Sequence, residues 1–213
     1  MAEADKVRLA VLASGGGSNA EAIWKHFQGH PFIEVVWVGS NRKDAGVLEK
    51  AEAAGIPCGS FSRADWELGA EGPVGEHLRS LGVRWLALAG FLRQVPASLL
   101  GMFGDRIVNV HPSLLPAFGG PGMYGTHVHE AVHRAFLAGQ TAHTGMTIHR
   151  VNERYDEGPI LFQARLEIEE EDTPASLAAR VLRLEHRYYP QILQSLLEVD
   201  AQRQAAEVTP SMP

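Results

Sequence analysis

Short apolar runs alternate along the sequence with segments whose apolar positions recur at helical spacing. The runs over residues 7–13, 35–39, 57–61, 85–89 and 106–110 have the length of buried strands, 57–61 being the least marked. Each of the first four is followed by a helical pattern. Buried strands that alternate with helices predict an α/β fold, here a Rossmann-like, doubly wound, mostly parallel sheet with helices on both faces.

The remaining elements and the domain boundary follow from the same pattern. We expect helices over 20–27, 44–54, part of 63–80, 96–103, about 129–138 and 174–199, and further strands over about 144–150 and 159–168. The chain has no evident repeat or linker, which predicts one domain over residues 1–199. Residues 200–213 are polar and lack a periodic apolar face, so we expect a flexible tail.

Composition narrows the class of protein. The 213 residues are 45% hydrophobic and 21% charged, which suits a globular domain. The formal net charge of −6 argues against a protein that coats nucleic acid or an anionic membrane. Cys58 is the single cysteine, so an internal disulfide is excluded. Since the sequence also lacks a signal peptide and a membrane span, we expect a cytoplasmic protein.

A glycine-rich loop over residues 14–19 joins the first strand to the first helix. Gly15, Gly17 and Ala20 fit a dinucleotide-binding pattern, but residues 40–42 are Ser-Asn-Arg where that pattern needs an acid for the ribose. Backbone amides at a helix N-terminus also bind a monophosphate, which needs no such acid. The loop therefore indicates a phosphate site, and a tight turn without a ligand is the alternative.

The loops 14–19, 90–94 and 109–112 all follow buried strands, where ligands of parallel sheets bind. Asn109 and His111 are two residues apart on an extended chain, so both side chains point to one side of it. An amide can donate to a developing oxyanion, and an imidazole can move protons near neutral pH. The alternative is a strand-end histidine bonded to the backbone.

Other polar residues allow further chemistry. Asp156 lies in a turn, where it shapes the backbone; next to His111 it would raise the pKa of the imidazole. His127, His129 and His133 have a spacing compatible with a metal site. Solvent-facing helix histidines are the alternative that we favour, because the chain offers neither a cysteine cluster nor an H-E-x-x-H pattern.

Five motifs, in order and spacing over residues 7–197, resemble the phosphoribosylglycinamide formyltransferases, a folate-dependent family of purine biosynthesis. They are Ser14-Gly-Gly-Gly-Ser-Asn19, Gly90-Phe-Leu-Arg93, Asn109-Val-His-Pro-Ser-Leu-Leu-Pro116, Thr144-Gly-Met-Thr-Ile-His149 and Asp156-Glu-Gly-Pro159. The resemblance implies transfer of a formyl group from 10-formyltetrahydrofolate to the amine of a glycinamide ribonucleotide. It also implies a phosphate-binding N-terminal half and a catalytic, folate-binding C-terminal half.

The resemblance assigns site residues by position. It implies that the catalytic residues are Asn109, His111 and Asp156; that Gly17, Ser18 and Asn19 bind the phosphate and Glu185 the ribose; and that Arg63, Leu92, Arg93, Gln94, Val95 and Asn109 contact the folate. In the mechanism implied, Asp156 keeps His111 cationic, and Asn109 and His111 stabilise an oxyanion. The resemblance implies that a monomer or homodimer binds two small molecules, the ribonucleotide and the folate. It implies no nucleic acid, membrane or metal partner.

The sequence departs from the commoner pattern in places. The loop 117–125 is longer than usual, which is compatible with a mobile lid, and Leu182 and Arg183 precede Glu185 where relatives carry a polar side chain. A formyltetrahydrofolate deformylase has a similar catalytic trio but usually an extra N-terminal domain, and methionyl-tRNA formyltransferase needs a further C-terminal domain. A non-enzymatic nucleotide sensor that uses only the phosphate loop is the alternative of a different class.

Overall fold

The structure, a computed structural model, describes residues 6–208, with side chains described to Arg203. The strands are β1 (Val7–Leu12), β2 (Ile33–Ser40), β3 (Cys58–Ser60), β4 (Trp85–Leu88), β5 (Ile107–His111), β6 (His143–Arg150) and β7 (Ile160–Glu167). The helices are α1 (Ser18–Phe27), α2 (Gly46–Ala53), α3 (Arg63–Glu67), η2 (Gly69–Glu71), α4 (Pro73–Ser80), α5 (Ala97–Phe103), η3 (Gly104–Arg106), α6 (Thr126–Leu137) and α7 (Pro174–Val208).

The strands form one seven-stranded sheet in the order β3-β2-β1-β4-β5-β6-β7. β1 to β5 are parallel, and β6 and β7 continue the sheet as an antiparallel pair beside β5. The chain winds outward from β1 in one direction and from β4 in the other, so the switch point lies between these two strands. The mostly parallel, doubly wound sheet that the sequence predicts is confirmed.

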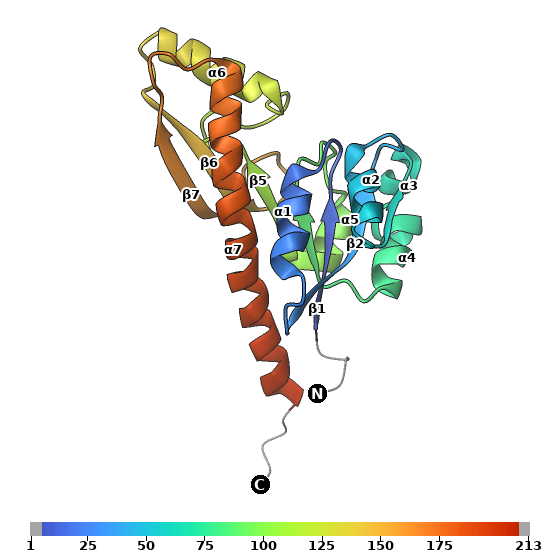
Figure 1. Cartoon of the computed structure of the whole chain (residues 1–213). Helices are drawn as coiled ribbons and strands as arrows, with labels where there is room; N and C mark the ends of the chain where they lie inside the picture. Colours follow the sequence, from blue (N-terminus) through green and yellow to red (C-terminus); the bar gives the residue numbers. More distant parts are fainter. Residues whose placement is uncertain (1–5, 209–213) are drawn as a thin grey trace.

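Helices cover both faces of the sheet (Figure 1), because its central strands are apolar on both sides. Along β1, Leu9 and Val11 join the core beneath α1, α2 and α7, whereas Ala10 and Leu12 join the core beneath α3, α4 and α5. Buried strands of this type leave ligands only the ends of the sheet. The fold therefore directs the site to the loops at the carboxyl ends of its strands.

The segment expected to be helical in part over 63–80 is divided into α3, η2 and α4. Gly69 has φ +61°, a conformation that favours glycine, and it interrupts the helical path. Ser62 caps α3 through a capping box with Asp65, and Pro73 opens α4 at its first turn. The break brings the Trp66 indole against the 90–95 loop, where its Nε1 donates to the Gln94 carbonyl at 2.8 Å.

The expectation that regular structure ends at Val199 is wrong, because α7 continues to Val208 (Figure 1). The added turns carry Asp200, whose Oδ2 accepts a hydrogen bond of 3.0 Å from the Trp85 indole at the start of β4. That contact comes from a distant strand, so local patterning could not reveal it. Residues 209–213, the rest of the expected tail, lie outside the described residues.

The helix α7 crosses the sheet and reaches the β6–β7 pair at one end (Figure 1). The fully buried hydroxyl of Tyr189 lies 2.8 Å from the Val108 carbonyl of β5 and 3.1 Å from the Leu88 carbonyl of β4. These contacts hold α7 in register against the strand ends. Glu185, one turn earlier on α7, is thereby held at the edge of the sheet where β4 and β5 end.

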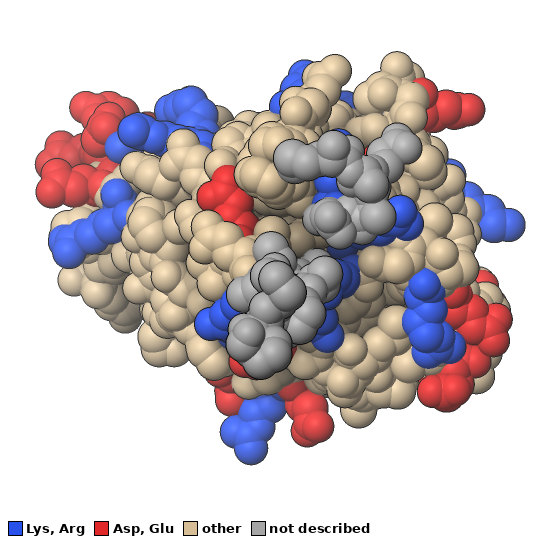
Figure 2. Space-filling view, turned by 90° about the horizontal axis from the view of Figure 1, so that it is seen from below, with Lys and Arg blue, Asp and Glu red and all other residues tan. Residues whose placement is uncertain are grey.

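The surface is of mixed charge. On the face shown in Figure 2, acidic and basic side chains are interspersed around the rim. Within the described residues, none of the helices combines the length and apolar character needed to cross a bilayer.

Candidate active site

A cavity of about 530 Å³ opens where β4 and β5 end, between the sheet, the β6–β7 connection, the start of α6 and one side of α7. This is a typical size for a small-molecule site. The lining residues include five of the six positions to which the resemblance assigns folate contacts: Leu92, Arg93, Gln94, Val95 and Asn109. The cavity lies beyond the carboxyl ends of the parallel strands, where the sequence predicts that ligands bind.

Asn109 and His111 both line this cavity from the end of β5, as their two-residue spacing predicts. His149 lies opposite Asn109 in the antiparallel pairing of β5 with β6. The Nδ1–H of His149 donates to the Arg150 carbonyl at 2.9 Å, so in the neutral ring Nε2 accepts a hydrogen bond from Asn109 Nδ2 at 3.0 Å. The amide of Asn109 is thereby oriented, with its second N–H available to a ligand.

His149 ends the motif that begins at Thr144, but the sequence did not predict a role for it in the site. Its contact with Asn109 depends on the register between β5 and β6, which are separated by 31 residues that include α6. A bulge between Ile148 and His149 in the pairing with β7 also changes the course of this strand. The alternation along this strand indicates that Thr147 and His149 share one face of it. It does not identify the strand that pairs with them.

The imidazole of His111 lies against the carboxylate of Asp156, with Nδ1 3.5 Å from Oδ2. Its Nε2–H donates to the Phe118 carbonyl at 2.8 Å, and Gly120 N–H donates to Asp156 Oδ2 at 2.9 Å. The structure thus brings together the three residues proposed as catalytic. It also ties both members of the His111–Asp156 pair to the loop 117–125.

The pKa of His111 shifts in the direction opposite to the expectation. Burial lowers the pKa of this imidazole, and the raising effects of Asp156 and the Phe118 carbonyl do not offset that loss of solvent. Burial raises the pKa of Asp156, but the imidazoles of His149, whose Nε2 lies 3.6 Å from Oδ1, and of His111, together with the Gly120 amide, outweigh this effect and lower the pKa overall. In the free protein the lowered pKa of His111 thus favours a neutral ring, whereas the expectation was that Asp156 keeps this ring cationic.

The glycine loop forms the N-terminus of α1. Gly17 is the N-cap residue with φ +70°, and a Cβ there would lie 2.3 Å from Val47 Cγ2, so only glycine fits beside α2. Because glycine has no side chain, the N-cap position leaves the amides of Ser18 and Asn19 to other acceptors. Such amides at a helix N-terminus favour an anion.

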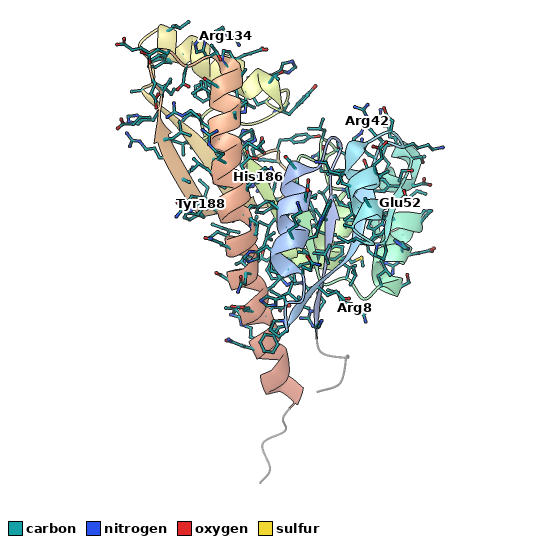
Figure 3. All side chains as sticks on the ribbon, in the orientation of Figure 1. Arg8, Arg42, Glu52, Arg134, His186 and Tyr188 are labelled. Atoms are coloured by element: carbon teal, nitrogen blue, oxygen red, sulfur yellow. The ribbon has the colours of Figure 1, made fainter. Side chains whose placement is uncertain are left out.

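Asn19 links this loop to α7, since its Nδ2 donates to Glu185 Oε2 at 2.5 Å. Burial raises the pKa of Glu185 to about 7, an effect that the Asn19 amide only partly reverses. The Oδ1 of Asn19 is buried without a hydrogen-bond partner among the described residues. His186, which follows Glu185 on α7, faces α1 (Figure 3). A buried carboxyl and an unpaired amide oxygen thus lie together at the cavity wall.

At pH 8, Glu185→Gln is expected to raise the free energy of unfolding by up to about 3 kcal/mol. At pH 5 the substitution should change this free energy little. The folded carboxyl keeps its proton up to about pH 7, whereas the ordinary pKa of a glutamate is 4.5, so the folded protein binds more protons than the unfolded chain between these values. Stability from this group is therefore greatest at low pH and falls as the pH rises through 7. Urea denaturation of both proteins at pH 5 and 8 measures the effect; parallel pH dependences would contradict it.

Residues 7–193, most of the chain, match the sequence pattern of the formyl transferase family. The chain belongs to the formyl transferase family. It is 41% identical over 200 residues to a chloroplastic phosphoribosylglycinamide formyltransferase of Arabidopsis thaliana, covering 92% of this chain and 67% of that protein. It is 40% identical over 198 residues to the phosphoribosylglycinamide formyltransferase of Bacillus subtilis, covering 89% and 94%.

This formyl transferase is also similar in structure to solved proteins of the same fold. The phosphoribosylglycinamide formyltransferase of Brucella melitensis superimposes with a TM-score of 0.77 at 41% identity, covering 90% of this chain and 96% of that one. The glycinamide ribonucleotide transformylase 1 of Symbiobacterium toebii gives a TM-score of 0.79 at 35% identity, covering 92% and 90%.

Arg63 and the histidines of α6 are the other candidate residues in this formyl transferase. Arg63 is exposed on α3 and pairs with Glu67 at 2.5 Å, outside the cavity. His127 is exposed beside Tyr124, and His133 bonds to the Asp172 carbonyl, but His129 is buried and lines the cavity. The expectation that these helix histidines face solvent is therefore wrong for His129. Among the described residues, no group of His, Cys, Asp or Glu is arranged to hold a metal.

Ser14 connects the two halves of the formyl transferase site. Its hydroxyl donates to Asn41 Oδ1 at 2.5 Å and accepts from the Leu92 amide at 2.9 Å, while its own amide donates to the Gly90 carbonyl at 3.0 Å. The side chain is buried at the end of β1. It thus joins the glycine loop to the 90–95 loop.

Ser14→Ala is expected to lower the free energy of unfolding by about 1–3 kcal/mol, because the buried Ser14 hydroxyl no longer accepts from the Leu92 amide or donates to Asn41 Oδ1. Both substrates should also bind more weakly, since the two loops lose a shared contact. Ser80→Ala, which removes an exposed bond to the His77 carbonyl, is the control. Denaturant titration and calorimetry measure these effects, and a variant as stable as the control would contradict them.

Proposed function

We propose that this formyl transferase transfers the formyl group of 10-formyltetrahydrofolate to the amine of N1-(5-phosphoribosyl)glycinamide, a step of purine biosynthesis. The two relatives compared above carry the name of this activity at about 40% identity. The observation that carries the proposal is the position of Asn109, His111 and Asp156 in one cavity, between the N-terminus of α1 and the 90–95 loop.

The walls suit the two substrates. The helix N-terminus at Gly17, Ser18 and Asn19 supplies amides for a phosphate, and Glu185 supplies a carboxyl for ribose hydroxyls. Leu92, Gln94 and Val95 border an apolar region suited to the folate ring, and the guanidinium of Arg93 suits an anionic glutamyl tail. Arg63 is left with a minor part in this proposal, because it pairs with Glu67 outside the cavity.

The catalytic groups act on the developing charges. As the substrate amine attacks and the new C–N bond forms, the formyl oxygen becomes an oxyanion. The free N–H of Asn109 Nδ2, held in place by His149, donates to that oxygen. This hydrogen bond strengthens as negative charge develops, which lowers the barrier rather than only binding the substrate.

His111 moves the proton. Its Nε2 proton is donated to the Phe118 carbonyl, so Nδ1 of the neutral ring accepts the proton that the attacking nitrogen releases. Asp156, 3.5 Å from Nδ1, stabilises the resulting imidazolium. The proton then passes to the folate nitrogen as its bond to the formyl carbon breaks and the carbonyl re-forms, so no charge is left over.

The experiment that tests the proposal follows deformylation of 10-formyltetrahydrofolate by the purified protein, with and without the glycinamide ribonucleotide. The proposal expects formyl loss only when the ribonucleotide is present, with one formylated product for each folate released. Formyl loss in its absence would instead identify a hydrolase, and neither reaction would overturn the enzymatic role. A cytoplasmic location and a monomeric or homodimeric state stay predictions.

A further inference from the structure

His129, which the proposed mechanism does not use, occupies the cavity wall. It is the fourth residue of α6 and is 6% exposed. Its Nδ1 is buried without a hydrogen-bond partner among the described residues. An enclosed polar atom without a partner is costly and is uncommon in folded proteins, unless a ligand supplies the missing contact.

The surroundings of the ring also favour its neutral form. Burial, and secondarily the neighbouring His111, lower the pKa of His129. A neutral imidazole has one N–H donor and one acceptor nitrogen, and neither has a partner among the described residues. Such a group suits an uncharged amide, which offers both a donor and an acceptor, better than it suits a phosphate.

The position of His129 selects the part of the substrate. On one side, α6 packs against α7, which carries Glu185 into the same cavity; on the other side lies His111, close enough to influence the charge of His129. In the proposed function Glu185 meets the ribose and His111 meets the reacting amine. The group that joins the ribose to the amine in the ribonucleotide is the glycinamide.

We infer that His129 binds the glycinamide group of the ribonucleotide by hydrogen bonding and so positions its amine toward the formyl carbon. This inference rests on the proposed function. It makes His129 a substrate-contacting residue specific to the ribonucleotide, because His129 neighbours His111 and lies on the helix that packs against α7, and these carry the groups proposed to meet the reacting amine and the ribose.

The test compares His129→Leu, His129→Asn and the exposed control His127→Leu by calorimetry with three ligands: the ribonucleotide, ribose 5-phosphate and a 10-formyltetrahydrofolate analogue that cannot transfer its formyl group. H129L should bind the ribonucleotide about tenfold more weakly, as the loss of one or two hydrogen bonds implies. Its affinity for ribose 5-phosphate, which lacks the glycinamide, and for the folate analogue should be unchanged. H129N, whose side-chain amide can take the place of Nδ1 in a hydrogen bond, should recover most of the affinity for the ribonucleotide. H127L should match the parent.

Two results would overturn the inference: unchanged ribonucleotide affinity in H129L, or equal weakening of all three ligands, which marks a structural role. If H129L fails to fold, the ring nitrogens of His129 in ¹⁵N-labelled parent protein provide the second measurement. Their resonances should shift with the ribonucleotide and not with ribose 5-phosphate, and equal responses would reject the contact. A parent protein that binds ribose 5-phosphate but not the ribonucleotide would reject the proposed function itself.

Discussion

Replacing His111 by alanine is expected to lower kcat for formyl transfer by about 10³-fold, within the range that general acid–base catalysis contributes. The imidazole is the group placed to take the proton from the attacking amine, and it lies 3.5 Å from the only carboxylate proposed to stabilise its cation. Alanine also removes the donor to the Phe118 carbonyl, so the loop 117–125 loses one of its ties.

The dissociation constants of both substrates should stay near those of the parent, because the proposed phosphate, ribose and folate contacts lie elsewhere in the cavity. Single-turnover kinetics and calorimetry separate the two effects. His26→Ala, an exposed histidine near the end of α1, is the matched control and should have parental turnover. Turnover within tenfold of the parent in the His111 variant would contradict the proton transfer assigned to this residue.

Replacing Asp156 by asparagine is expected to lower kcat by about 10²–10³-fold. Asparagine tolerates the φ of +57° found at this position, and its side-chain oxygen can still accept from the Gly120 amide. The substitution therefore removes the charge and leaves the local backbone and size unchanged. The loss should arise because the imidazolium of His111 is no longer stabilised.

The same variant has a signature in its pH dependence. Asp156 raises the pKa of His111, so its loss lowers that pKa further below the usual value. Because the neutral ring accepts the proton, activity is lost as the pH falls through this pKa. The acid limb of the kcat profile should therefore move to lower pH in the asparagine variant. A limb that stays in place, or moves to higher pH, would show that the coupling between the two groups is not the one proposed.

The structure explains why the charge of His111 could not be obtained from sequence. The spacing of Asn109 and His111 is local, so period-2 alternation was enough to put both on one side of β5. The pKa of His111 depends on the solvent that the folded cavity excludes and on the distance to Asp156, 45 positions further along the chain. The sequence indicated the partner but not the burial that outweighs it.

His129 illustrates the same difference on a helix. Its relation to His127 and His133 suggested either a metal site or an exposed face, since helical spacing shows which residues share a face and not what covers it. Packing of α6 against α7 and the cavity decides that His129 is buried while His127 is exposed. The extension of α7 past Val199 likewise depends on Asp200 meeting Trp85.

The sequence by itself determined the alternation of strands and helices, the glycine loop at the start of α1 and the paired Asn109 and His111, because each depends on residues close together in the chain. Only the tertiary structure decided that His149 orients Asn109, that Asp156 lies against His111 and that Asn19 meets Glu185. These contacts join strands and helices whose separation in sequence is 40, 45 and 166 residues. Their geometry and burial exist only once the sheet order and the docking of α7 are established.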